Sequence, residues 1–230
     1  ALRKSKEEYG KNTLMVFYIG DPALKLAIPK PKIVLTKIND VPLGQNVEDL
    51  KALSVIKLTG EVRDETGNNI LSNYNGDLAV NIFDKPIDRK TLGNDGQSDS
   101  NNNLITMNFK ILGETIFRGN ASVKNGLFEF TFVVPRDIRV PVGNGRISFY
   151  AKKTGELIDQ TGFDTSIIIG GINNNAVADE IAPTVKLYMN DTNFVNGGIT
   201  NESPILLAFL NDENGINTAS GIGHDIIGIL

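Results

Sequence analysis

The clearest hydrophobic pattern in the chain lies at residues 126–135, which read GLFEFTFVVP. Phenylalanines at positions 128, 130 and 132 alternate there with leucine, glutamate and threonine. Successive side chains of a β-strand point to opposite faces, so this alternation predicts a strand with one aromatic face in a core. Residues 55–63 show the same period, with Ile56, Leu58 and Val62 in one row and Lys57 in the other. Gly60 falls in the apolar row.

The alternation recurs often enough between Lys32 and Gly171 to predict seven strands. They lie at 32–38, 52–64, 76–84, 114–123, 126–135, 145–153 and 162–171. Clusters of asparagine and glycine separate most of them, and both residues favour tight turns. Seven short strands in about 140 residues fit an immunoglobulin-like β-sandwich, so we expect a mainly β fold. The chain has no cysteine and no tryptophan, so this expectation concerns the architecture alone.

The first 30 residues have a different character. Residues 1–10 are helical in composition, and the apolar run at 14–19 suits a buried strand that ends in Gly-Asp-Pro. A helix, a buried strand and such a turn are typical of the last unit of an α/β domain. We therefore expect residues 1–30 to hold a short helix and strand from the end of such a domain. Asp21 itself belongs either to an active-site loop or to a turn that ends the strand.

We expect the sandwich to span residues 31–171 and a linker to follow at 172–183, which contains a triple asparagine and ends at Pro183. Three further strands are predicted at 184–190, 204–212 and 225–230. Three strands are too few for an independent sandwich, so residues 184–230 are expected to be a partial second β-domain, truncated or completed by another chain. Within the sandwich, the polar segment 90–103 predicts a long, mobile loop.

Composition restricts the chemistry that the chain can perform. It has 23 lysines and arginines against 27 acidic residues, a net charge of −4, which gives no reason to expect nucleic acid as a partner. No apolar run approaches the roughly 20 residues of a membrane-spanning helix. With no cysteine and a single histidine, His224, the chain lacks a thiol nucleophile and the common zinc ligand sets. We therefore predict that the chain itself is not catalytic.

Oxygen-bearing side chains provide one candidate metal site. Residues 211–217 read NDENGIN, which brings acidic and amide oxygens close together, as calcium loops do. Asp191, Asp212 and Asn214 are the candidate Ca²⁺ ligands. Their spacing does not match an EF-hand, and an ordinary surface turn explains the same residues. His224 is either a metal-binding or pH-responsive group or a structural histidine, and no other cofactor is expected.

Several phrases resemble one protein family. Residues 12–29, NTLMVFYIGDPALKLAIP, are similar to the end of the catalytic domain of gingipain-like cysteine peptidases. Residues 52–68, ALSVIKLTGEVRDETGN, and 117–138, FRGNASVKNGLFEFTFVVPRDI, resemble the C-terminal part of the sortases of the type IX secretion system. The stretch 182–226 adds to this resemblance, and its asparagine-rich phrase LNDENGIN is the most specific part.

The resemblance implies an outer-membrane protease at the cell surface. Such sortases remove the C-terminal sorting domain from secreted cargo and join the cargo to an anionic lipopolysaccharide, using a Cys nucleophile and a His base. Because this chain has no cysteine, no catalytic residue can be carried over to it. The resemblance then implies a fragment C-terminal to the catalytic Cys and His. Residues 1–30 would end the caspase-like peptidase domain.

Two roles follow for such a fragment. In the first, the sandwich braces the upstream catalytic domain and offers surface to secreted cargo and to other secretion-system subunits. In the second, the chain is a stand-alone cell-surface adhesin or carbohydrate-binding β-sandwich. The second role requires exposed aromatic side chains, for which Tyr74 and Tyr188 are the candidates.

Overall fold

The computed structural model describes residues 32–177, 180–212 and 215–216. Over this part of the chain it contains strands, turns and loops and no helix. The mainly β fold predicted from the alternation is confirmed. The helix and strand predicted within residues 1–30 lie outside the described residues.

One layer of the fold has three antiparallel strands, in the order β1-β4-β9. Their bounds are Ile33–Ile38, Val55–Val62 and Leu127–Val133. The predicted alternation holds: in β4 the row that starts at Ile56 is buried, and in β9 Phe128 and Phe132 are buried. These inward rows form one wall of the core.

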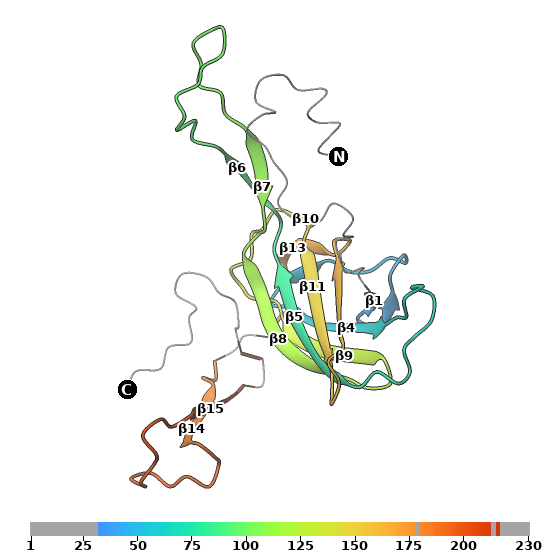
Figure 1. Cartoon of the computed structure of the whole chain (residues 1–230), viewed down its shortest axis with the longest axis vertical. Helices are drawn as coiled ribbons and strands as arrows, with labels where there is room; N and C mark the ends of the chain where they lie inside the picture. Colours follow the sequence, from blue (N-terminus) through green and yellow to red (C-terminus); the bar gives the residue numbers. More distant parts are fainter. Residues whose placement is uncertain (1–31, 178–179, 213–214, 217–230) are drawn as a thin grey trace, which may run out of the picture.

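The second layer has four antiparallel strands, in the order β8-β5-β11-β12. Their bounds are Thr115–Val123, Gly76–Phe83, Arg146–Lys153 and Asp159–Asp164. A parallel pairing of β1 with β12 joins the two layers into one continuous sheet. Three strands facing four is the arrangement of an immunoglobulin-like sandwich, which is the architecture that the sequence predicted (Figure 1).

Four shorter strands complete this body, and one of them corrects the sequence prediction. Their bounds are Val41–Pro42 (β2), Leu50–Ala52 (β3), Gly143–Asn144 (β10) and Ile168–Ile172 (β13). β13 leaves the main sheet and pairs with β3 and β10 in a separate three-stranded sheet. The single strand predicted at 162–171 is therefore two strands, β12 and β13, because residues 165–167 carry the chain from one sheet to the other.

Aromatic and aliphatic side chains from both layers fill the space between them. The rings of Phe128 in β9 and Phe149 in β11 lie with centroids 5.4 Å apart, a direct contact across the layers. Phe117 of β8 contacts Phe132 of β9 with centroids 4.7 Å apart. Full burial of one such side chain stabilises a fold by about 1.5–3 kcal/mol. The two layers therefore share one hydrophobic core.

Two glycines are needed where backbones and rings approach closely. A Cβ at Gly60 would lie 2.3 Å from the Phe128 ring, which explains why a glycine stands in an apolar row. A Cβ at Gly162 would lie 2.1 Å from the carbonyl oxygen of Ile33. Since Ile33 and Gly162 are the paired residues of β1 and β12, Gly162 permits the parallel contact that joins the layers.

An antiparallel hairpin projects from one end of the sandwich, between β5 and β8 (Figure 1). Its strands are β6, Ile87–Lys90, and β7, Asn108–Ile111. We call residues 87–111 the arm. The sequence predicted a long polar, mobile loop at 90–103. Lys90 belongs to β6 instead, whereas residues 91–103 contain turns and loop and no strand, with hydrogen bonds between the two sides of the arm.

A separate two-stranded ribbon follows the sandwich, made of β14, Thr184–Met189, and β15, Leu206–Asn211. These correspond to two of the strands predicted after the linker, and residues 173–183 contain no described strand. The third predicted strand, at 225–230, lies outside the described residues. Nowhere in the described part of the chain is there a helix of the length and hydrophobicity needed to cross a membrane.

Candidate interaction site

The arm carries a row of exposed apolar side chains, which we call the stripe: Ile105, Met107, Phe109 and Ile111. Their exposed fractions are 57%, 68%, 43% and 40%. Alternate residues of a strand share a face, so Phe109 and Ile111 lie on one side of β7. Ile105 and Met107 continue the same alternate spacing in the segment before β7. A hollow of about 740 Å³ lies beside the stripe, lined in part by Leu92. Exposed apolar residues are common singly, whereas a contiguous row suggests a contact surface.

The arm keeps its shape through hydrogen bonds along its length. Thr91 and Met107 exchange two of them, of 2.9 and 2.8 Å, just beyond the last rung of β6 and β7. At the tip, the Asp99 carboxylate accepts hydrogen bonds from the backbone N–H groups of Asn101 and Asn103, both 2.9 Å. The bonds from Asn103 are the main cause that holds the pKa of Asp99 below its usual value. The tip is thus an ordered turn that a charged carboxylate organises.

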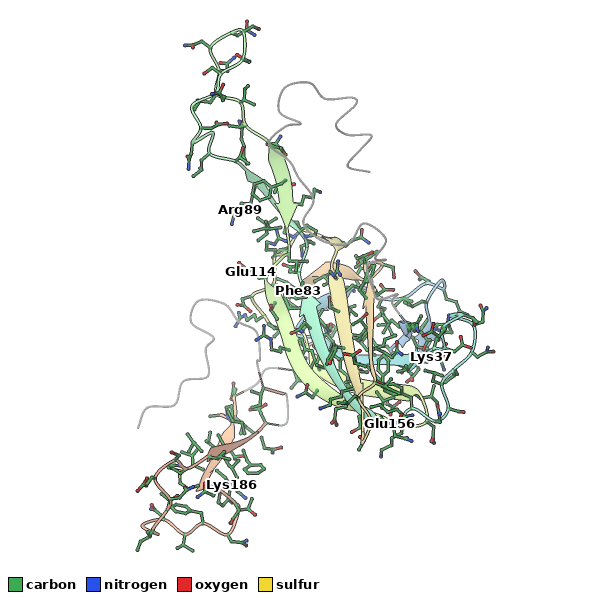
Figure 2. The ribbon with its side chains drawn as sticks, viewed as in Figure 1. Lys37, Phe83, Arg89, Glu114, Glu156 and Lys186 are labelled. Atoms are coloured by element: carbon green, nitrogen blue, oxygen red, sulfur yellow. The ribbon has the colours of Figure 1, made fainter. Side chains whose placement is uncertain are left out.

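The arm meets the sandwich at a joint, residues 84–86 and 112–114, between the paired strands β5–β8 and β6–β7. Figure 2 shows Phe83 and Glu114 at this level and Arg89 further out along the arm. Asp84 and Lys85 are almost completely buried there, with exposed fractions of 2% and 9%. Buried charges require partners, and these two have them.

The Asp84 carboxylate makes four polar contacts. Its Oδ1 lies 2.6 Å from the Lys85 ammonium and 2.8 Å from the Lys85 backbone nitrogen. Its Oδ2 accepts hydrogen bonds of 3.2 Å from both the backbone nitrogen and Nε of Arg139. Burial raises the pKa of Asp84, but the hydrogen bonds from Lys85 and Arg139 outweigh it and leave the pKa below its usual value. Asp84 is therefore charged near neutral pH.

Two of the three predicted Ca²⁺ ligands, Asp191 and Asp212, lie apart in the structure. Asp191 follows the end of β14 and Asp212 follows the end of β15, and these antiparallel strands put the two residues at opposite ends of the ribbon. Five residue steps of antiparallel strand span roughly 17 Å, too far for one coordination shell. Asn214 lies outside the described residues, as do His224 and Asp21. No group of three metal-ligating side chains occurs in the part of the chain that the structure describes.

The aromatic residues proposed for sugar binding are placed differently from the prediction. Tyr74 is only 2% exposed and donates a hydrogen bond of 2.9 Å to the carbonyl oxygen of Ala151, so it is a core residue and the prediction of an exposed ring there is wrong. Tyr188 is half-buried and lies against Phe209 of the ribbon. By contrast, Tyr150 and Phe163, on neighbouring strands β11 and β12, are 46% and 48% exposed.

Two comparisons with known proteins gave no match: no family model matches the chain, and neither does any curated protein. Among solved structures, the chain is similar to dimeric latent PorU from Porphyromonas gingivalis, with 30% sequence identity and a TM-score of 0.62. The match covers 90% of this chain and 19% of the PorU chain. The match to the sporulation control protein Spo0M from Bacillus subtilis covers 60% of this chain and 48% of the Spo0M chain, at 13% identity. Its TM-score of 0.28 is too low to indicate a shared fold.

The match to PorU concerns both sequence and fold. At 30% identity over nine-tenths of the chain, the likeness is not limited to the sandwich architecture. The chain is PorU-like over this length. The chain spans about a fifth of the length of the PorU chain.

Proposed function

We propose that the chain is a non-catalytic, immunoglobulin-like region of a type IX secretion sortase, and that it acts as a contact module. The similarity to PorU supports the protein class. The composition supports the non-catalytic role, because a chain without cysteine has no thiol nucleophile. In this view the parent protein is a cysteine endopeptidase and transpeptidase at the outer surface of the outer membrane, and its catalytic Cys and His lie upstream of the sandwich.

The observation that carries this role is the stripe on the projecting arm. Within the described chain these four side chains keep between 40% and 68% of their surface exposed to water. Removing that apolar area from water on contact is favourable, at about 25 cal/mol per Å². The stripe would therefore pack on another part of the parent protein, on a second copy, or on a secretion partner. PorU was crystallised as a dimer, which makes a second copy one of the surfaces to test.

A matched pair of variants of the full-length parent protein tests the stripe. The stripe variant carries Met107→Ser with Phe109→Ser, and the control carries Asn108→Ser with Lys110→Ser on the other face of the same strand. Light scattering reports assembly, and chemical cross-linking from the arm reports its neighbours. We expect the stripe variant to lose arm cross-links or assembly while the control keeps both. Unchanged cross-links and assembly in the stripe variant would refute the contact role.

The bracing role has its own test in the same parent protein. Deleting residues 31–171 should lower the thermal stability of the catalytic domain and reduce removal of the sorting domain from secreted cargo. Cargo processing and protease stability equal to those of the intact protein would show that the sandwich does not brace the enzyme.

A second candidate function, carbohydrate binding, is favoured by the exposed pair Tyr150 and Phe163. Aromatic faces stack on sugar rings through their apolar area, and this pair lies on the outer face of the four-stranded layer. Arg146 already covers the Phe163 ring at 4.6 Å, which lowers the free area of that ring. A glycan array probed with the purified chain distinguishes the two functions. Glycan binding that Tyr150→Ala abolishes would support an adhesin function. An array on which no glycan binds would exclude carbohydrate binding as the function.

A further inference from the structure

We infer that the buried pair Asp84 and Lys85 forms, with the partly exposed Arg139, a clamp that sets the direction of the arm relative to the sandwich. The orientation of the arm does not depend on which partner the stripe contacts. Regular strand pairing is interrupted at the joint. The β5–β8 ladder shifts register between Ile82 and Phe83, and Pro86 has no N–H with which to continue a ladder into β6.

Few groups hold the two chains of the joint in register. The backbone N–H of Asp84 donates to the carbonyl oxygen of Glu114 at 2.8 Å. On the returning chain, a Cβ at Gly113 would lie 2.2 Å from the carbonyl oxygen of Asp84 and 2.4 Å from that of Lys85. A glycine is thus needed for the two chains to approach this closely. A joint of this kind bends easily unless something outside the hairpin restrains it.

The restraint comes from two segments that are distant in sequence. The Lys85 ammonium donates to the carbonyl oxygens of Arg139 at 2.8 Å and Ile169 at 3.2 Å, besides its contact with Asp84. These three acceptors match the three N–H donors of an ammonium group. The Lys85 stem also packs on Gly143, where a Cβ would lie 3.1 Å from it. The lysine therefore ties the base of the arm to the loop after β9 and to β13.

Arg139 closes the arrangement from the opposite side. Its backbone nitrogen and its Nε both bond to Asp84 Oδ2, and its guanidinium also donates to the carbonyl oxygen of Lys85. Asp84 sits between two cations, and no buried side-chain nitrogen or oxygen in the described part of the chain lacks a hydrogen-bond partner. Removing one partner of a buried charge leaves that charge uncompensated, so movement of Lys85 or Arg139 away from Asp84 is costly. The three residues are positioning residues for the arm.

The absence of native cysteine makes the test direct, because spin labels attach only where cysteines are introduced. Labels at Asn101→Cys on the arm tip and Ser122→Cys on β8 report the distance between arm and sandwich by pulsed electron resonance. The clamp variants are Asp84→Asn and Arg139→Gln. The matched control is Asp88→Asn, which removes the carboxylate of an exposed ion pair on the arm, 3.9 Å from Lys110.

We expect one narrow distance distribution in the labelled chain without further substitutions and in the control. Both clamp variants should lose that narrow distribution. Circular dichroism and amide exchange of β5 and β11 verify that the sandwich stays folded. If Asp84→Asn prevents folding, Arg139→Gln and Lys85→Met, which keeps the apolar stem, decide the question. A narrow, unshifted distribution of the distance between the two labels in a folded clamp variant would overturn the inference. A broad distribution in the labelled chain without further substitutions would overturn it as well.

Discussion

Tyr74 offers a sharp test of how the core is held together. Its side chain is 2% exposed and its hydroxyl donates to the carbonyl oxygen of Ala151 in β11. Tyr74→Phe removes that hydroxyl and changes little else, because the ring still fills the same space. A buried hydrogen bond contributes about 0.5–1.5 kcal/mol, and a buried acceptor left without its donor costs about 1–3 kcal/mol. We expect the free energy of unfolding to fall by about 1–2 kcal/mol.

Tyr150→Phe is the matched control. The Tyr150 hydroxyl bonds to the Asp159 carboxylate at 3.1 Å, but the residue is 46% exposed, so water replaces the lost contact. We expect a change within about 0.5 kcal/mol, as for most surface substitutions. Urea unfolding of the two variants beside the parent chain measures both effects. Equal losses in the two variants, or no loss in Tyr74→Phe, would refute the assignment of Tyr74 to a buried hydrogen bond.

The same residue predicts an alkaline pH dependence. Burial, followed by the charge of Asp159, raises the pKa of Tyr74 to about 12 from its ordinary value near 10. Between these two values the unfolded tyrosine loses its proton while the folded one keeps it, so the stability falls as the pH rises. The slope from this one group is at most about 1.4 kcal/mol per pH unit. Tyr74→Phe should remove this part of the pH dependence. Parallel curves of unfolding free energy against pH for the two proteins would contradict this prediction.

Three further predictions concern the sheet, the arm and the ribbon. Gly162→Ala should destabilise the fold by about 1–3 kcal/mol in thermal unfolding, because its Cβ meets the Ile33 carbonyl oxygen, whereas the exposed Ser122→Ala should change little. Asp99→Ala should speed amide exchange at Asn103, since the carboxylate that accepts its N–H is lost; unchanged exchange would show that the carboxylate does not organise the tip. EDTA should leave the melting temperature unchanged, because Asp191 lies far from Asp212. A fall of several degrees would instead show that the chain binds a metal ion.

The strands of the sandwich were predictable because one face of each is apolar and the other is mostly polar. That pattern depends only on neighbours along the chain, as in β4 and β9. The arm was predictable in part. Ile105, Met107, Phe109 and Ile111 repeat with the period of a strand, but the polar segment before them is a loop. Only the pairing of β6 with β7, on either side of that loop, shows that the arm is a hairpin.

The clamp and the separated metal ligands were not predictable, for one physical reason. Lys85 and Arg139 lie 54 residues apart, and nothing near either residue in the sequence indicates that they meet. In the same way, Asp191 and Asp212 have suitable oxygen atoms, but the antiparallel register of β14 and β15 separates them. Local patterns predict elements, whereas contacts between charged groups depend on how the elements pair.

A stripe that contacts another part of a larger protein is covered there and exposed in the isolated chain. Hydrogen exchange of residues 105–111, measured in the isolated chain and in the full-length parent protein, distinguishes these two states. We expect slower exchange of these amides in the parent protein, with the exchange of β5 and β11 unchanged. Equal exchange of residues 105–111 in both proteins would contradict the contact role of the stripe.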